Sequence, residues 1–420
     1  MKRDHTMGTE SSFTAPVKRE GIGWTPSWSS KAAALSVVAV ELAAMFIGAT
    51  LPTPLYPLYR QAFGFGGIML TLIFAVYVIG NLAALLIFGR LSDQIGRRRA
   101  TLPAIAVALL STLAFALARG TAWLFVARVL SGFATGLAAG AATAWIAELQ
   151  PRGNKAAAAL LASTANLSGL VVGALLSGTL AQVAPWALRL SYVVYLALLA
   201  AVAVAIVAVP ETVSERVARL SELSLRPRLG VPKDIRLAFT APAVTAFATF
   251  ALMGFYAAII PNLLGESLHQ KAPLVAGAVV AELFLVAVLA ALATAKVGSR
   301  GAMLSGLVVL LPSLALLVVA QLAHSLWLLI AATALGGMSA ALGYRGSLQV
   351  VNAIAPADQR SEVVSSYLVA CYLGNALPVI GIGFLSAATS SLVAHAVFAL
   401  VIGLLAAGAL VIGVKYAPRH

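Results

Sequence analysis

Apolar residues in this chain come in long, unbroken runs that short polar segments separate. Twelve of these runs are close to the length of about 20 residues that an α-helix needs to cross a bilayer. Strands of a transmembrane barrel would alternate apolar and polar residues instead. The pattern therefore predicts an all-α membrane protein with twelve transmembrane helices, over residues 32–52, 67–89, 101–118, 121–147, 156–182, 187–209, 239–262, 273–295, 302–322, 325–353, 362–386 and 391–414.

The longest polar gap, residues 210–238, divides the runs into two sets of six. It predicts two pseudo-symmetric six-helix bundles, residues 32–209 and 239–414, which the gap joins as a cytoplasmic linker. Residues 1–31 are predicted to be a cytoplasmic tail without fixed structure, and residues 415–420 a short C-terminal tail. The fourth and tenth runs both end in a proline followed by basic residues, which is the kind of internal repeat that many transporters show.

Composition narrows the class of protein. Of the 420 residues, 61% are hydrophobic and 10% are charged, whereas a soluble domain has about 25% charged residues. A soluble enzyme, a nucleic-acid-binding domain and a disordered chain are thereby excluded. The single cysteine, Cys371, allows no internal disulfide, and the histidines are scattered. We expect no metal, no cofactor and no enzymatic activity, because no catalytic cluster or metal-ligand spacing is present.

The basic residues are distributed unevenly between the two sides of the predicted membrane. If the N-terminus is inside, 22 of the 28 Lys and Arg residues fall on inner segments and 4 on outer loops; the other two, Arg128 and Arg345, lie within runs. By the positive-inside rule, both termini are predicted to be cytoplasmic. The net charge of +14 then faces the inner leaflet rather than nucleic acid. We expect a monomer in a bacterial inner membrane whose partners are the lipid bilayer, protons and a small-molecule substrate.

A motif follows the second run, where the chain reads Gly89-Arg-Leu-Ser-Asp93-Gln-Ile-Gly96-Arg97-Arg98. The glycines permit unusual backbone angles, and Asp93 can sit against a helix N-terminus. The segment resembles the signature loop of the major facilitator superfamily, Gly-x-x-x-Asp-x-x-Gly-Arg-Arg/Lys. The resemblance implies the major facilitator fold, and it implies that Gly89, Asp93, Gly96, Arg97 and Arg98 form a gate that latches the two halves on the cytoplasmic side.

Three ionisable residues lie within the runs and are candidates for proton coupling. Glu41, in the middle of the first run, shares a helical face with Met45 and Gly48, so we expect it to point into the bundle. Burial in hydrocarbon favours the uncharged acid, which would let Glu41 bind and release a proton; the alternative is a structural hydrogen bond. Glu282, in the eighth run, is a second proton site or a contact for a cationic substrate.

Arg128 is the third candidate. It resembles the arginine that proton-coupled exporters of the superfamily carry in the fourth span; the alternative is a side chain that snorkels to the interface. The fifth run keeps Gly173 and Gly178 of the pattern Gly-Pro-x-x-Gly-Gly, which drug–proton antiporters of the superfamily tend to show. This partial match favours an exporter. The alternative is that these glycines serve only for helix packing.

Other polar residues recur at helical spacing and are candidates for lining a substrate cavity. The alternative is a hydrogen bond between helices or, for Arg345, a side chain that snorkels to the cytoplasm. The candidates are Tyr77, Asn81, Asn166, Gly173, Tyr256, Arg345 and Asn375.

The sequence as a whole predicts a proton antiporter that exports small, largely hydrophobic molecules by alternating access. The alternative is a proton-coupled uptake symporter for a sugar, organic anion or other metabolite, which Arg345 favours. The substrate is left open by the sequence.

Overall fold

The structure is a computed structural model that describes residues 31–89, 91–150, 153–213 and 229–417. The predicted N-terminal tail up to residue 30, half of the predicted linker (residues 214–228) and the last three residues of the chain lie outside the described residues.

Within the described residues, twelve helices are long and apolar enough to cross a membrane, and no strand is present. The predicted all-α membrane fold is therefore confirmed. The spanning helices are α1 (Lys31–Thr50), α3 (Gly67–Phe88), α5 (Arg97–Ala116), α6 (Thr121–Leu149), α7 (Lys155–Val183), α8 (Leu190–Val207), α9 (Arg236–Ala258), α11 (Pro273–Ala293), α12 (Ser299–Leu322), α13 (Leu326–Ile354), α14 (Arg360–Ala388) and α15 (Ser391–Tyr416).

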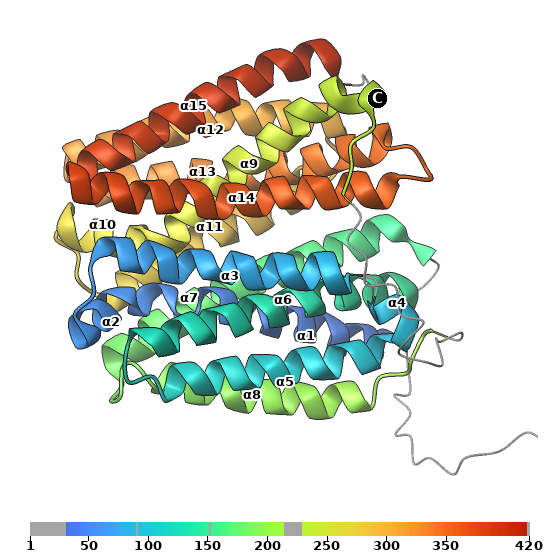
Figure 1. Cartoon of the computed structure of the whole chain (residues 1–420), viewed down its shortest axis with the longest axis horizontal. Helices are drawn as coiled ribbons and strands as arrows, with labels where there is room; N and C mark the ends of the chain where they lie inside the picture. Colours follow the sequence, from blue (N-terminus) through green and yellow to red (C-terminus); the bar gives the residue numbers. More distant parts are fainter. Residues whose placement is uncertain (1–30, 90, 151–152, 214–228, 418–420) are drawn as a thin grey trace, which may run out of the picture.

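Three short helices were not predicted: α2 (Tyr56–Phe63), α4 (Leu91–Ile95) and α10 (Ile260–Glu266). α2 and α10 each follow the first spanning helix of a set, and each has a proline in its first two positions, Pro57 and Pro261. Proline is tolerated there because the first N–H groups of a helix have no intrahelical partner. We call the end of the molecule with α2 and α10 the clasp end, and the opposite end with α4 the motif end (Figure 1).

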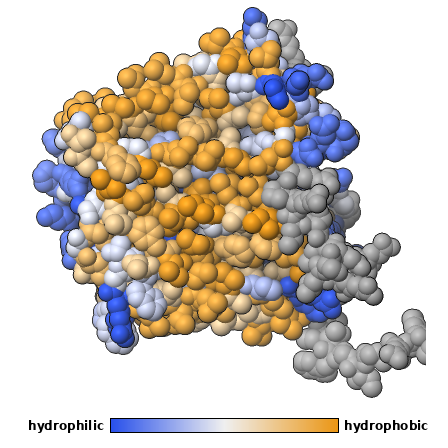
Figure 2. All heavy atoms as spheres, in the orientation of Figure 1, coloured by the Kyte–Doolittle hydropathy of each residue, from blue (hydrophilic) through white to orange (hydrophobic). Residues whose placement is uncertain are grey.

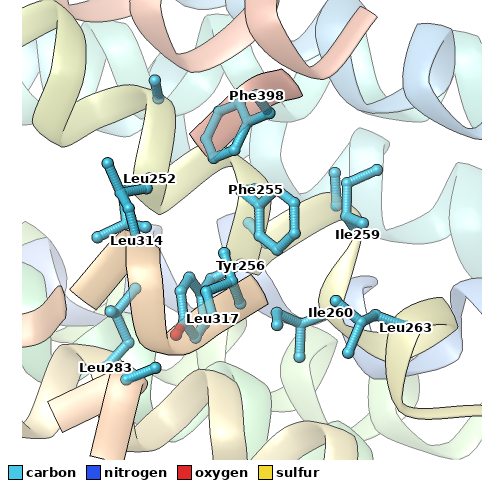
Figure 3. Packing of buried hydrophobic residues seen from close by; sticks show 14 of the residues in the cluster. Leu252, Phe255, Tyr256, Ile259, Ile260, Leu263, Leu283, Leu314, Leu317 and Phe398 are labelled. Atoms are coloured by element: carbon cyan, nitrogen blue, oxygen red, sulfur yellow. The ribbon is translucent and has the colours of Figure 1, made fainter. Parts of the chain in front are cut away.

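The helices form two layers, with α1–α8 in one half and α9–α15 in the other (Figure 1). Each half has an apolar core of its own; Figure 3 shows the second, in which Phe255, Tyr256 and Leu314 pack together. Hydrophobic residues cover the middle of the surface in Figure 2, and hydrophilic residues gather at the two ends. An apolar band between two polar rims is what a bilayer requires, so the chain is a multi-pass membrane protein.

The two halves meet where α7 lies along α11 and α3 lies along α14. Near the clasp end, Gly178 of α7 faces Gly277 of α11 so closely that a Cβ on Gly277 would lie 2.5 Å from the carbonyl oxygen of Ala174. Gly383 of α14 packs in the same way on the side chain of Thr71 at the start of α3. These backbone approaches hold the halves together at the clasp end.

Candidate functional site

The gate motif folds into a compact turn at the motif end. Gly96 has a φ of 106° between α4 and α5, a value that a residue with a Cβ rarely adopts. Asp93, on α4, pairs with the guanidinium of Arg97 in the first turn of α5. That guanidinium also bonds Glu148 at the end of α6, with Nη2 2.6 Å from Oε1. Arg97 is buried despite its charge because these two carboxylates neutralise it.

Asp93 lies in the first turn of α4, at a helix N-terminus as expected. A second carboxylate, that of Glu211, lies at the N-terminus of α5: its oxygens accept the backbone N–H groups of Arg97 at 2.9 Å and Arg98 at 3.2 Å. Glu211 follows α8 and is far from the motif in sequence, so no local pattern reveals it. Among the described residues, Asp93, Arg97 and Arg98 bond to partners in the first half. Gly89 directly follows α3.

Glu41 lies in the core of the first half. Its side chain is 0% exposed, and neither carboxyl oxygen has a hydrogen-bond partner among the described residues. One turn further along α1, Tyr195 of α8 donates to the carbonyl oxygen of Ala44 at 2.9 Å, which shows that this face of α1 packs on α8 within the half. Glu41 therefore faces the helix bundle and not lipid.

A small cavity lies beside this face of α1. Its volume is about 10 Å³, and α1, α5, α6 and α8 enclose it. That volume is about what one water molecule needs. Polar groups of Ser131, Thr135 and Tyr195 border it, next to Met45 and Gly48 of α1. The first half thus offers a polar, water-sized space one turn of α1 beyond Glu41.

Arg128, on α6, is 1% exposed and does not snorkel to the surface. Its Nη1 donates to the carbonyl oxygen of Ala49 at 3.0 Å, and its Nε has no partner. Three aromatic rings surround the guanidinium, with centroids at 5.9 Å for Tyr56, 5.4 Å for Phe74 and 5.0 Å for Tyr77. Cation–π attraction, rather than a carboxylate, stabilises this buried charge.

Glu282 differs from Glu41 in its surroundings. It is only half-buried on α11, and helical spacing puts it on the same face as Leu285 and Leu289, both exposed. It lies in the other half from Glu41 and Arg128, so the structure does not bring the three candidate proton-coupling residues into one cluster.

The candidate cavity residues fall into two groups. Tyr77, Asn81 and Asn375 lie in the middle of α3 and α14, where the halves meet; Nδ2 of Asn81 is 3.4 Å from the Tyr77 hydroxyl, and Nδ2 of Asn375 is 3.5 Å from the carbonyl oxygen of Phe250.

The second group lies elsewhere. Gly173 is packed on α1, since a Cβ there would lie 2.5 Å from Oγ1 of Thr50. Tyr256 is buried in the second core, where its hydroxyl accepts from Thr333 at 3.0 Å. Arg345 points to the motif end, with Nη2 3.4 Å from the carbonyl oxygen of Val297. Asn166 is half-buried on α7.

A polar contact between the halves was missed from the sequence. At the clasp end, Nη1 of Arg60 on α2 lies 3.1 Å from Oε1 of Glu266 and 3.3 Å from Oδ1 of Asn262, both on α10. We call these three residues the clasp. A signal for it was present: both first helices of a set end in a proline-containing polar segment, 52–60 and 261–266.

Twelve spanning helices in two halves, with small residues at their interface and polar residues at mid-depth, define a secondary transporter. The chain belongs to the major facilitator superfamily, because the sequence model described as "Major Facilitator Superfamily" matches residues 39–281, more than half of the chain. The expected family and fold are therefore confirmed.

Two further comparisons agree. The uncharacterized MFS-type transporter EfpA of Mycobacterium tuberculosis, found in two strains, is 30% identical over 159 residues; the match covers 37% of this chain and only 30% of the relative's length. A bacterial homologue of the human lysosomal transporter Spinster, inward-facing and unoccupied, superposes with a TM-score of 0.70 at 16% identity and covers 94% of this chain and 99% of that one. Its occupied form gives 0.68, also at 16% identity, over 93% and 98% of the two chains. At this identity the likeness concerns the fold alone.

Proposed function

We propose that the protein exports small, largely hydrophobic molecules in exchange for protons by alternating access. The membrane is a bacterial inner membrane, with the motif end in the cytoplasm. The observation that carries the proposal is the fully buried carboxyl group of Glu41, whose oxygens have no hydrogen-bond partner in the part of the chain that the structure describes. An isolated carboxylate is too costly to bury, so in this conformation the group must hold a proton.

Release of that proton requires a different conformation. Glu41 is sealed inside the first half, so water reaches it only when the helices of that half shift or the halves rock apart. A proton biases the equilibrium between two conformations only if its affinity differs between them. A group that is dry in one conformation and wet in the other meets this condition.

Arg128 supports the role of Glu41 without pairing with it. Its anchor on α1, Ala49, lies eight residues beyond Glu41, which is about 12 Å along a helix. The fixed positive charge favours deprotonation of Glu41 in the state where water enters, yet the distance prevents a permanent ion pair. Glu282, which is half-buried in the second half, is assigned as a second proton or cation site.

The test is transport by purified protein in proteoliposomes. A susceptibility panel in a strain that lacks its own pumps first supplies a transported compound. Glu41→Gln keeps the shape of the side chain but cannot release a proton, so it is expected to abolish uphill export driven by a pH gradient while downhill exchange continues. Glu362→Gln, at the start of α14 near the motif end, is the control and should pump like the wild type.

Uphill export by Glu41→Gln at the wild-type rate would refute the assignment. The direction of flux is a separate measurement: in inverted vesicles, an exporter accumulates the compound when the lumen is acidified. Loss of accumulation under that gradient, with accumulation in right-side-out vesicles instead, would establish the uptake symporter.

A further inference from the structure

We propose that α3, α9, α13 and α14 form a binding site for an uncharged, planar aromatic molecule that carries a hydrogen-bond donor. The inference rests on the proposed function, because it names the class of compound that the transporter carries. Four observations lead to it: an aromatic cluster, its position between the halves, an unpartnered acceptor and the signs of the nearest charges.

Three aromatic rings form the cluster. The centroid of Phe250 on α9 is 5.4 Å from that of Tyr344 on α13 and 6.1 Å from that of Tyr372 on α14, with interplanar angles of 59° and 72°. All three side chains are partly exposed. Tyr367, which is buried behind Tyr344, holds the cluster in place through a 2.7 Å contact between its hydroxyl and Oγ of Ser347. Tilted rings of this kind leave faces and edges on which a further ring can stack.

The cluster borders the contact between the two halves. Tyr372 packs against Tyr77, Val78 and Ala376, a group of residues drawn from α3 and α14. Phe250 belongs to α9, whose backbone at this point accepts from Asn375. The three rings all belong to the second half, and Tyr77 of α3 supplies the neighbouring surface of the first half. A molecule that packs on Tyr372 beside Tyr77 therefore touches both halves, and its presence changes the energy of moving one half against the other.

Asn81 supplies the polar element of the site. Its side chain is 1% exposed, and its Oδ1 has no hydrogen-bond partner. Its amide bonds the Tyr77 hydroxyl, and Tyr77 packs in the same group as Tyr372, so a ring packed on Tyr372 brings a donor toward Oδ1. Buried acceptors without a partner are uncommon, and a ligand N–H or O–H would satisfy this one.

The charges around the site select against ions. α3 contains no charged residue, and the charges of α9 and α14 lie at their first turns. Two arginines adjoin residues of the site: Arg128 lies over the ring of Tyr77, and Arg345 follows Tyr344 in the chain. A cation is repelled by both, and an anion offers lone pairs to an acceptor that needs a donor. An uncharged donor fits both conditions.

Equilibrium dialysis with the full chain in lipid nanodiscs tests the proposal with three probes. These are 1-naphthol, which is uncharged and has one O–H; 1-methoxynaphthalene, which has the same rings but no donor; and tetraphenylphosphonium, which is a cation. We expect 1-naphthol to bind saturably, with a dissociation constant up to about tenfold lower than that of 1-methoxynaphthalene. A difference of this size corresponds to a single hydrogen bond. Tetraphenylphosphonium should bind more weakly than 1-naphthol.

Variants assign the effect to the site. Asn81→Leu should remove the preference for 1-naphthol over 1-methoxynaphthalene. Tyr372→Leu should weaken both naphthalenes, whereas Tyr372→Phe, which keeps the ring, should bind them like the wild type. Asn352→Leu, an exposed amide near the end of α13, is the matched control and should change nothing.

A preference for 1-naphthol that persists in a folded Asn81→Leu protein, or tighter binding of the phosphonium, would overturn the proposal. If Asn81→Leu does not fold, Asn81→Ala provides the same test: it removes Oδ1 without adding bulk, and an unchanged preference for 1-naphthol would exclude the site. Binding needs no pH gradient, so these results are independent of the transport test on Glu41.

Discussion

The first half buries three side chains that carry a charge in water, Glu41, Arg97 and Arg128, whereas the second half buries polar side chains that are uncharged. The polar groups in the second core are paired: Ser313 donates to the carbonyl oxygen of Ala332 at 2.8 Å, and Thr333 donates to Tyr256. In the first half, the carboxyl oxygens of Glu41 and the hydroxyls of Tyr56, Tyr59 and Tyr192 have no hydrogen-bond partner among the residues that the structure covers.

This difference indicates that the two halves, although similar in architecture, have different roles. A buried polar group without a partner destabilises the fold, so it persists only where it serves another purpose. The second half has a packed apolar core (Figure 3), and we expect it to move as one rigid body. The first half carries the groups whose protonation and hydration differ between conformations. Removal of a polar group should therefore have opposite effects on stability in the two halves.

The largest effect is expected at Glu41. Glu41→Met replaces the unpartnered carboxyl with an apolar chain of similar length, and it should raise the free energy of unfolding by up to about 3 kcal/mol. Unfolding in mixed detergent micelles measures this change. A loss of stability would show that the carboxyl has a partner, such as a water in the adjacent cavity, and would weaken the contrast between the halves.

The opposite sign is expected in the second half. His395 lies in its core, with Nδ1 2.6 Å from Oε1 of Gln321, so this histidine is packed between α12 and α15. Gln321→Leu leaves the imidazole without its partner and should lower the free energy of unfolding by about 1–2 kcal/mol.

A double variant supplies the control. Gln321→Leu combined with His395→Phe removes both polar partners, and it should recover most of the stability because no unpaired group remains. If the double variant is no more stable than the single one, packing rather than hydrogen bonding holds this pair, and the contrast with the first half is smaller than inferred.

The smallest effect is expected at the clasp, which joins the two halves. Arg60 and Glu266 are 31% and 50% exposed, and pairs of this kind contribute about 0.2–1 kcal/mol. Glu266→Gln should therefore leave global stability nearly unchanged but increase hydrogen exchange in α2 and α10, since those helices open first at the clasp end.

The exchanged pair Arg60→Glu with Glu266→Arg should restore protection from exchange. Unaltered exchange in Glu266→Gln would assign closure of this end to the glycine contacts between α7 and α11 alone.

The spans and the gate motif could be predicted because both are local in sequence: about 20 apolar residues suffice to identify a spanning helix, and the motif residues are contiguous. The partners of the key side chains could not be predicted, because they come from elements that are far apart in the sequence. The rings around Arg128 come from α2 and α3, and the cap on α5 comes from Glu211, after α8. Helical spacing placed Gly173 with the cavity candidates, but the same spacing also suits contact with α1, which is where it lies.

The single cysteine is fully buried within the second half. Its thiol is not accessible to water-soluble maleimides and nitroxides, so the natural chain should incorporate almost no label. A cysteine introduced on α2 and another on α10 would then report their separation by electron spin resonance, and the motion of the two halves could be followed as the pH is changed.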